Sequence, residues 1–120
     1  MTLAGMRVLV VEDESVLSML IEMQLENLGC RVVGSASRLA EAMEKASTLD
    51  VDIGLLDVNL AGEMSYPVAA MLRARNVPVV FATGYGVAGR PAELHDVPVL
   101  TKPFLEEQLA DALRAVKAML

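Results

Sequence analysis

The chain has 120 residues, enough for one domain that buries about two thirds of its unfolded surface, and we expect no second domain. Its net charge of −6 and the lack of a Lys/Arg cluster argue against nucleic-acid binding. The single cysteine, Cys30, excludes an internal disulfide and suits a reduced, cytoplasmic protein, while no apolar run is long enough to span a membrane.

The chain begins with an apolar strand that runs into acids. The continuous run 6–11 predicts a buried strand that stops at Glu12 and Asp13. Apolar residues at helical spacing then predict a helix that ends at Gly29, where a helix C-cap favours positive φ. The expected inward positions of this helix are Leu17, Leu20, Ile21, Leu25 and Leu28.

The next section contains the stretch that carries the most chemistry. Residues 31–36 predict a second, shorter strand, and Ser37 is expected to cap a helix over 38–47. The apolar run 51–60 then predicts a strand that is buried on both faces. Asp57 emerges from this run and is expected at the carboxyl end of the strand.

Two more strands are predicted after a third helix. Residues 66–73 keep a helical period, with a proline suited to a first helical turn. The run 77–82 predicts a fourth strand that ends at Thr83, and the run 97–101 predicts a fifth that ends at Lys102.

The helix between these last two strands is expected to be short or irregular. Gly89 and Pro91 interrupt any helical period between 87 and 96. A regular helix follows the fifth strand, with its inward face at Leu109, Ala112, Leu113, Val116 and Leu120. Strand and helix therefore alternate along the whole chain, which indicates an α/β fold with a parallel sheet and helices on both faces.

Several polar side chains are predicted to meet at one edge of this sheet. The carboxyl ends of parallel strands share an edge, which is where ligands bind in open α/β sheets. This edge would collect Glu12, Asp13, Asp57, Thr83 and Lys102. Three carboxylates and one ammonium leave a charge of about −2 in one pocket, an arrangement that favours a divalent cation. Oxygen donors of this kind point to Mg²⁺, or to Mn²⁺.

Asp57 is the candidate nucleophile of this pocket. Near a divalent cation, its carboxylate could attack phosphorus to give an acyl phosphate, while Thr83 and Lys102 bind the phosphoryl oxygens. Taken alone, Asp57 and Thr83 also suit a helix cap or turn. Lys102 precedes Pro103, which favours an extended backbone at the strand end and directs the lysine to the same edge.

The acidic pair Glu12-Asp13, the acceptor Asp57, Thr83 and Lys102-Pro103 resemble, in that order, the receiver domains of two-component response regulators. The resemblance implies a flavodoxin-like fold of five parallel strands in the order 2-1-3-4-5. It also implies a phosphoryl group accepted on Asp57 from a histidine kinase, in a reaction that needs magnesium. The implied metal ligands are Asp13, Asp57 and the backbone carbonyl of Asn59, with Glu12 acting directly or through water.

A narrower resemblance rests on the run Phe-Ala-Thr-Gly-Tyr-Gly at 81–86, which is similar to the signature of the single-domain FATGUY receivers. It implies that residues 1–120 form one receiver domain without an effector domain. It also implies that the Lys102-Pro103 peptide bond is cis, which proline makes accessible.

The segment after the fourth strand is the expected switch. Many receivers carry an aromatic residue where this chain has Val99. We expect Thr83, Gly84 and Tyr85 to form the switch, with Tyr85 replacing that aromatic residue. Because of its glycines, the segment 84–96 is predicted to sample several conformations before activation.

The resemblance implies a signalling protein rather than an enzyme. Its expected partners are a sensor histidine kinase or phosphotransfer protein and a downstream target, unless it serves only as a phosphate sink. The exposed Leu and Val residues of the last helix and the segment 85–98 are the expected docking face.

Three other classes of protein fit the sequence less well. A flavodoxin would share the fold, but the acids after the first strand would repel its phosphate. A hydrolase of the aspartyl-phosphate type needs an acid two residues after the nucleophile, where this chain has Asn59. A receiver that no longer accepts phosphate and only binds a partner would leave the acidic pocket and Lys102 without a role.

Overall fold

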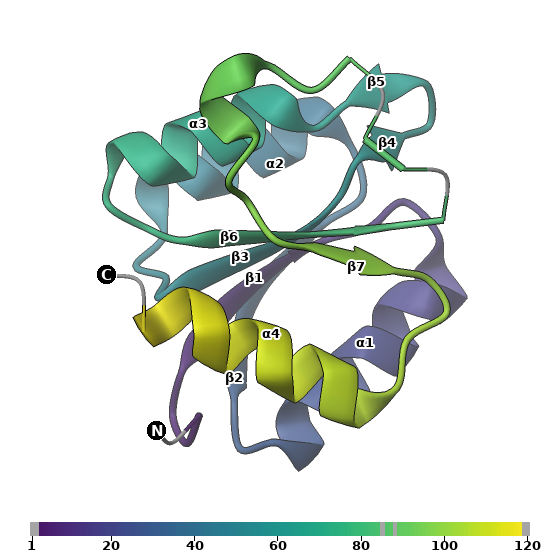
Figure 1. Cartoon of the computed structure of the whole chain (residues 1–120), viewed down its shortest axis with the longest axis vertical. Helices are drawn as coiled ribbons and strands as arrows, with labels where there is room; N and C mark the ends of the chain where they lie inside the picture. Colours follow the sequence, from purple (N-terminus) through teal and green to yellow (C-terminus); the bar gives the residue numbers. More distant parts are fainter. Residues whose placement is uncertain (1–2, 85, 88, 119–120) are drawn as a thin grey trace.

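The structure, a computed structural model, describes residues 3–84, 86–87 and 89–118. Its main sheet (Figure 1) has five parallel strands: β1 (Arg7–Val11), β2 (Arg31–Ala36), β3 (Ile53–Asp57), β6 (Val79–Thr83) and β7 (Val99–Thr101). The strands lie in the order β2-β1-β3-β6-β7. This confirms the predicted order, because the intervening β4 and β5 form a separate small sheet.

Helices cover both faces of the sheet, as predicted. Figure 1 shows helices packed on each face. One face carries α1 (Ser15–Asn27) and α4 (Glu106–Ala118), and the other carries α2 (Leu39–Thr48) and α3 (Tyr66–Ala74). The fold is therefore flavodoxin-like. None of the helices in the described part of the chain is long and apolar enough to cross a membrane.

The central strand β1 shows why its sequence is continuously apolar. Successive side chains of a strand point to opposite faces. Val8 and Val10 pack in the cluster that includes α1 and α4, whereas Leu9 and Val11 pack in the cluster that includes α2 and α3. Because both faces are covered, every position of the strand favours an apolar side chain.

Two helices differ from the expected detail. Leu20 of α1 was predicted to face inward, but it is 50% exposed, and the buried residues of this helix are Ile21 and Leu25. Ser37 does not cap α2: its N–H donates a hydrogen bond to Glu41 Oε1 (3.0 Å), and the N-cap position is Arg38 without a side-chain cap.

The exposed apolar surface also lies elsewhere than predicted. The Leu and Val side chains of the described part of α4 are buried, so they cannot form the expected docking face; they are Leu109, Leu113 and Val116. The predicted inward position Leu120 and residue 85 of the expected docking segment lie outside the described residues. Among the described residues, α1 carries the longest exposed apolar row, which comprises Val16, Met19, Leu20 and Met23.

A small hairpin that the sequence did not indicate follows β3. It pairs β4 (Asn59–Leu60) with β5 (Glu63–Met64) through a turn at Ala61 and Gly62. The φ angles of these turn residues are 53° and 95°. Positive φ at both central positions is typical of the tight turns that join antiparallel strands.

The segment between β6 and β7 contains only one short 3₁₀ helix, η1 (Ala92–Leu94), in its described part. The prediction of a short or irregular fourth helix is therefore confirmed. Arg73 of α3 holds this segment from outside, because its guanidinium donates to both carboxylate oxygens of Asp96 (2.8 and 3.0 Å) and to the Glu93 carbonyl (3.1 Å). Strand β7 then forms one border of the sheet, between Pro98 and Pro103.

Candidate functional site

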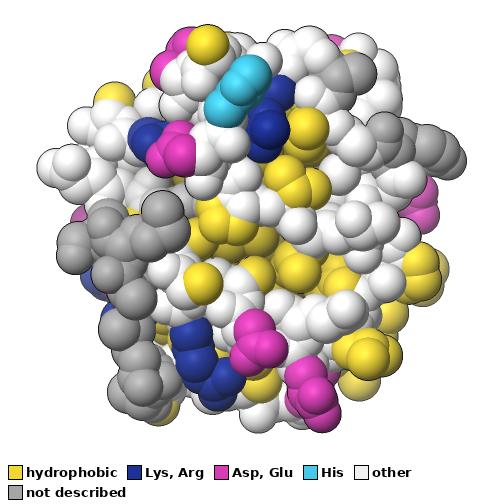
Figure 2. Space-filling model, viewed as in Figure 1, with side chains coloured by type: hydrophobic (Ala, Val, Ile, Leu, Met, Phe, Trp, Pro, Cys, Tyr) yellow, Lys and Arg dark blue, Asp and Glu magenta, His cyan; other side chains and the backbone are white. Residues whose placement is uncertain are grey.

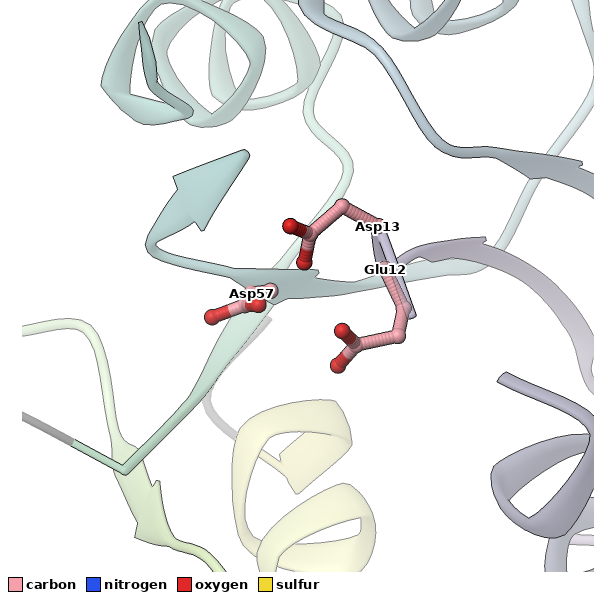
Figure 3. Close-up of side chains that lie close together, drawn as sticks. All are labelled: Glu12, Asp13 and Asp57. Atoms are coloured by element: carbon pink, nitrogen blue, oxygen red, sulfur yellow. The ribbon is translucent and has the colours of Figure 1, made fainter. Parts of the chain in front are cut away.

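The ends of the central strands bring the predicted acids together. Glu12 and Asp13 follow β1 directly, and Asp57 is the last residue of β3. One carboxylate oxygen from each of the three residues lies within 4.8 Å of the others. Figure 3 shows the three side chains gathered at this edge of the sheet. Parallel pairing of β1 with β3 aligns the two strand ends, which explains why residues far apart in sequence meet here.

Asp57 lies at the end of β3, where it lines an open cleft. Its side chain is 11% exposed, and one oxygen lies 3.3 Å from the Lys102 ammonium. Burial raises the pKa of Asp57, while the charge and hydrogen bond of Lys102 act in the opposite direction. The carboxylate is therefore partly desolvated but still faces an open cleft.

Glu12 is more deeply buried than Asp57. Only 1% of its side chain is exposed, and Oε1 contacts the Lys102 ammonium. Its other oxygen, Oε2, accepts a hydrogen bond from the Glu14 N–H (3.2 Å). Burial raises the pKa of Glu12 to about 7, because the hydrogen bonds from Lys102 and Glu14 offset only part of the cost of desolvating the charge.

Lys102 joins the two carboxylates from the end of β7. Burial alone would lower the pKa of its ammonium, but the hydrogen bond to Glu12 and the negative charges of Asp57 and Glu12 outweigh this effect and raise the pKa. Lys102 therefore carries a positive charge at neutral pH. The sequence predicted that Lys102 lies at the same edge as the acids, but not that it contacts Glu12 more closely than Asp57. The Lys102-Pro103 peptide bond is cis.

The third acid is held by the hairpin after β3. Asp13 Oδ2 accepts a hydrogen bond from the Ala61 N–H (3.2 Å), and Asn59 Oδ1 accepts one from the Gly62 N–H (2.7 Å). The turn thus fixes one oxygen of Asp13, a residue that also lines the cleft beside Asp57. Sequence reasoning missed Ala61, since nothing about an alanine indicates that its N–H will meet a carboxylate.

Thr83 completes the set at the end of β6. It is 3% exposed, and its hydroxyl donates a hydrogen bond to the Gly86 carbonyl (3.1 Å). Gly84, the next residue of the predicted switch, is exposed. The third predicted switch residue, Tyr85, lies outside the described residues. Val99 on β7 is 39% exposed, so no described side chain fully covers the position where many receivers carry an aromatic residue.

An open cleft of about 490 Å³ gives access to Asp13, Asp57 and Lys102, whereas Glu12 and Thr83 do not line it. It is lined by Asp13, Glu14, Leu17, Asp57, Asn59, Ala61, Gly62, Gly84 and Lys102. Clustered carboxylates, a neighbouring backbone carbonyl and an open approach fit a hard divalent cation such as Mg²⁺. The same arrangement leaves Asp57 accessible as a nucleophile.

A separate apolar hollow lies away from this site. Figure 2 shows apolar side chains gathered on the face between η1 and α4. A cavity of about 230 Å³ on this part of the surface is lined by Arg73, Asn76, Val77, Pro78, Val79, Asp96, Val97, Pro98 and Val116. None of the predicted site residues belongs to this lining. The predicted site residues therefore lie at the carboxyl edge of the sheet rather than in the apolar hollow.

Comparisons with curated proteins point to sensory response regulators. The sensory transduction protein LytT of Bacillus subtilis (strain 168) is 32% identical over 120 residues, an alignment that covers 93% of this chain and 48% of LytT. The cell cycle response regulator CtrA of Brucella ovis is 29% identical over 116 residues and is covered to 50%. The chain thus spans about half the length of the curated relatives it matches.

Solved structures agree with the fold. The solution structure of SdrG from Sphingomonas melonis Fr1 superposes with a TM-score of 0.82 at 40% identity, over 97% of this chain and 98% of SdrG. The receiver domain of the sensor histidine kinase PA1611 from Pseudomonas aeruginosa PAO1, solved with a magnesium ion coordinated in its active site cleft, gives a TM-score of 0.81 at 28% identity. It is matched over 96% of this chain and 99% of that domain.

A family model settles the relationship. The model described as the response regulator receiver domain matches residues 8–114, which contain β2, β3, β6 and β7 entirely and β1 from Val8 onward. The strand order and the helix layers agree with that family. The chain therefore belongs to the response regulator receiver domains, which are signalling modules of two-component systems.

Proposed function

We propose that Asp57 accepts a phosphoryl group from a histidine kinase or a phosphotransfer protein in a reaction that requires Mg²⁺. The observation that carries the proposal is the site geometry: a partly exposed carboxylate lies 3.3 Å from a lysine and beside two further acids. A strand-end carboxylate with these neighbours suits the capture of a phosphoryl group better than a structural role.

The chemistry follows from the groups present. An Asp57 oxygen attacks the phosphorus of a phosphohistidine, and the P–N bond breaks as the new P–O bond forms. The imidazole nitrogen leaves with the bonding electron pair and takes a proton from water. The Lys102 ammonium, already beside Asp57, then pairs with a phosphoryl oxygen, and the Thr83 hydroxyl donates to another.

Mg²⁺ fits the donor set of this site. Asp13, Asp57 and the backbone carbonyl of Asn59 would hold the ion, with Glu12 close to it. When bound, the ion supplies positive charge that offsets the repulsion between the carboxylates and the incoming phosphoryl oxygens. Asn59, two residues after Asp57, offers no carboxylate to promote rapid hydrolysis, which supports a signalling role over that of a hydrolase.

The exposed row on α1 is the proposed docking surface for the phosphodonor. Val16, Met19, Leu20 and Met23 are each at least half exposed and follow helical spacing. Leu17 of the same helix lines the cleft that contains Asp57. A partner that covers the row would thus lie next to the acceptor. A second protein that reads the phosphorylated state is proposed as the downstream target.

The test is labelling of Asp57 by a small P–N donor. The purified chain is incubated with phosphoramidate and Mg²⁺, and the phosphorylated residue is located by mass spectrometry after trapping with hydroxylamine or borohydride. Asp57→Asn is expected to abolish labelling. Asp52→Asn is the matched control, because Asp52 precedes the same strand but lies at its opposite end, where it pairs with Arg7 (3.0 Å).

Labelling should also stop when the divalent cation is removed with a chelator. Labelling of Asp57→Asn at the wild-type level, or unchanged labelling in excess chelator, would refute the proposed function. The wild type and Asp52→Asn are also tested with a purified partner kinase as donor. If neither protein is labelled by phosphoramidate or by the kinase, the chain is a receiver that binds a partner without phosphoryl transfer, and the proposed function is wrong.

A further inference from the structure

Glu12 differs from the other two acids in how its oxygens are used. Oε1 contacts the Lys102 ammonium and Oε2 accepts the Glu14 N–H (3.2 Å), so both oxygens already have partners within the protein. Asp13, in contrast, accepts a hydrogen bond from the Ala61 N–H through Oδ2. The side chain of Glu12 is 1% exposed, compared with 11% for Asp57. Glu12 therefore faces Lys102 rather than the open cleft.

The position of Lys102 depends on how two carboxylates share it. Its Nζ contacts Glu12 and lies 3.3 Å from Asp57. An ammonium has three donors and can serve both acids, but it moves toward whichever charge is left when one is removed. Of the two acids that contact Lys102 in the described part of the chain, only Asp57 would remain without Glu12. The ammonium would then compete with any cation for the nucleophilic carboxylate.

The length of the Glu12 side chain helps it to reach Lys102. Glu12 follows β1 and Lys102 follows β7, and β3 and β6 lie between these strands in the sheet. A glutamate reaches one methylene further from β1 than an aspartate would. Two long side chains thus span the two intervening strands.

The charges of the pocket also favour a pairing of Glu12 with Lys102 rather than with the cation. When Glu12 is ionised, its charge and that of Lys102 cancel. Asp13 and Asp57 then remain with a combined charge of −2, which matches one divalent cation.

We propose that Glu12 is a positioning residue, which holds Lys102 partly away from Asp57 and does not itself ligate the cation. The inference rests on the proposed function, because it concerns the magnesium site of that reaction. It assigns ligation to Asp13, Asp57 and the Asn59 carbonyl, and it assigns to Glu12 the control of where the lysine lies before phosphoryl transfer.

The first test observes the lysine directly in the metal-free protein. Buried, hydrogen-bonded ammonium protons exchange slowly and give a resolved ¹H–¹⁵Nζ correlation at low temperature. We expect this signal for Lys102 in the wild type and its loss in Glu12→Gln and in the shorter Glu12→Asp. Glu44→Gln, the same change at an exposed acid on α2, should retain it. A Lys102 signal that is unchanged in both Glu12 variants would overturn the proposal.

The second test separates positioning from ligation by a double-mutant cycle on Mg²⁺ affinity, measured at pH 8 through amide shifts of Ala61 and Gly62. If Glu12 acts through Lys102, Glu12→Gln should weaken Mg²⁺ binding at least threefold more in the wild-type background than in Lys102→Met. If Glu12 is a ligand, its loss should weaken binding by an equal or larger factor in Lys102→Met, which would overturn the proposal. The ammonium measurement needs neither metal nor phosphoryl donor, so failure of this inference is distinguishable from failure of the proposed function.

Discussion

Ala61 joins two properties that seldom occur together in one alanine: a left-handed backbone and a hydrogen bond to a candidate metal ligand. Its φ is 53°, and its N–H donates to Asp13. For an L-residue with a Cβ atom, the left-handed region costs about 1–2 kcal/mol. This conformational strain lies in the turn of the β4–β5 hairpin, which also positions Asp13.

Replacing Ala61 by glycine should relieve this strain. Glycine adopts positive φ freely but gains freedom in the unfolded chain, so we expect a net rise in the free energy of unfolding of up to about 1 kcal/mol. Ala70→Gly is the control, because Ala70 is exposed within α3 and the same change there should cost about 1 kcal/mol. Urea denaturation measures both. Equal losses in the two variants would show that the turn at Ala61 is unstrained.

Single residues also mark the limit of what the sequence could predict. Asp57, Asp13 and Lys102 were assigned to one edge because each follows an apolar run, and strand ends in a parallel sheet coincide. The partner of Glu12 was not predicted, since it depends on side-chain reach across two strands. The Asp13 contact with Ala61 depends on a turn whose strands are too short to show a period.

At the scale of elements, η1 shows how a weak helix is held in place. Gly89 and Pro91 indicated that no long helix could form, and the structure has one short 3₁₀ turn in the described part of this segment. Its anchor, Arg73, comes from α3 and was not predicted, because Arg73 and Asp96 are far apart in sequence and each resembles an ordinary surface charge. The prediction that Leu20 faces inward was wrong for a related reason. Helical spacing identifies the apolar face of a helix, but it does not show how much of that face a neighbouring element covers.

Arg73→Ala should loosen η1 without unfolding the domain. The ion pair is bidentate, but its side chains are 36% and 58% exposed, so solvent screening keeps its contribution to global stability small. We expect protection of the Leu94 and Val97 amides from hydrogen exchange to fall by about fivefold or less, because both donate within this segment.

The control for that experiment is Arg114→Ala, which removes a looser exposed pair with Asp111 (3.7 Å) on α4. It should leave the Leu94 and Val97 amides unchanged. If Arg73→Ala also leaves their protection at the wild-type value, the carbonyl and carboxylate contacts of Arg73 do not anchor the segment.

At the scale of the whole molecule, the parallel α/β architecture followed from the alternation of apolar strands with helical periods. The strand order did not follow from periodicity, which is blind to sheet position; it came from the family resemblance and is confirmed. The same architecture buries Glu12 beneath the site, and that burial affects the stability of the entire fold.

Global stability should therefore depend on pH through Glu12. Burial raises the pKa of Glu12 from 4.5 in the unfolded chain to about 7 in the folded one, so the folded state favours the protonated acid. This contribution is complete below pH 4.5 and is lost as the pH rises through 7. Without divalent cations, the free energy of unfolding of the wild type should fall over this range, relative to Glu12→Gln, by at most about 3 kcal/mol.

Urea denaturation at several pH values between 4 and 8 measures this difference. The comparison with Glu12→Gln removes the opposing contributions of Asp52 and Asp96, whose pKa values are lowered by Arg7 and Arg73 in both proteins. A free energy of unfolding of the wild type that rises with pH relative to that of Glu12→Gln, or that changes in parallel with it, would contradict the burial of an ionisable Glu12.

The short border strand β7 also has a bearing on how the molecule avoids self-association. A border strand offers unpaired backbone groups to any extended chain, and such templates promote fibre-like stacking. Here only Val99–Thr101 form the strand, and Pro98 and Pro103 on either side lack the N–H needed to lengthen a ladder. An incoming chain could pair over three residues at most. The prolines that shape the region beside Lys102 thus also make this side of the sheet a poor seed for aggregation.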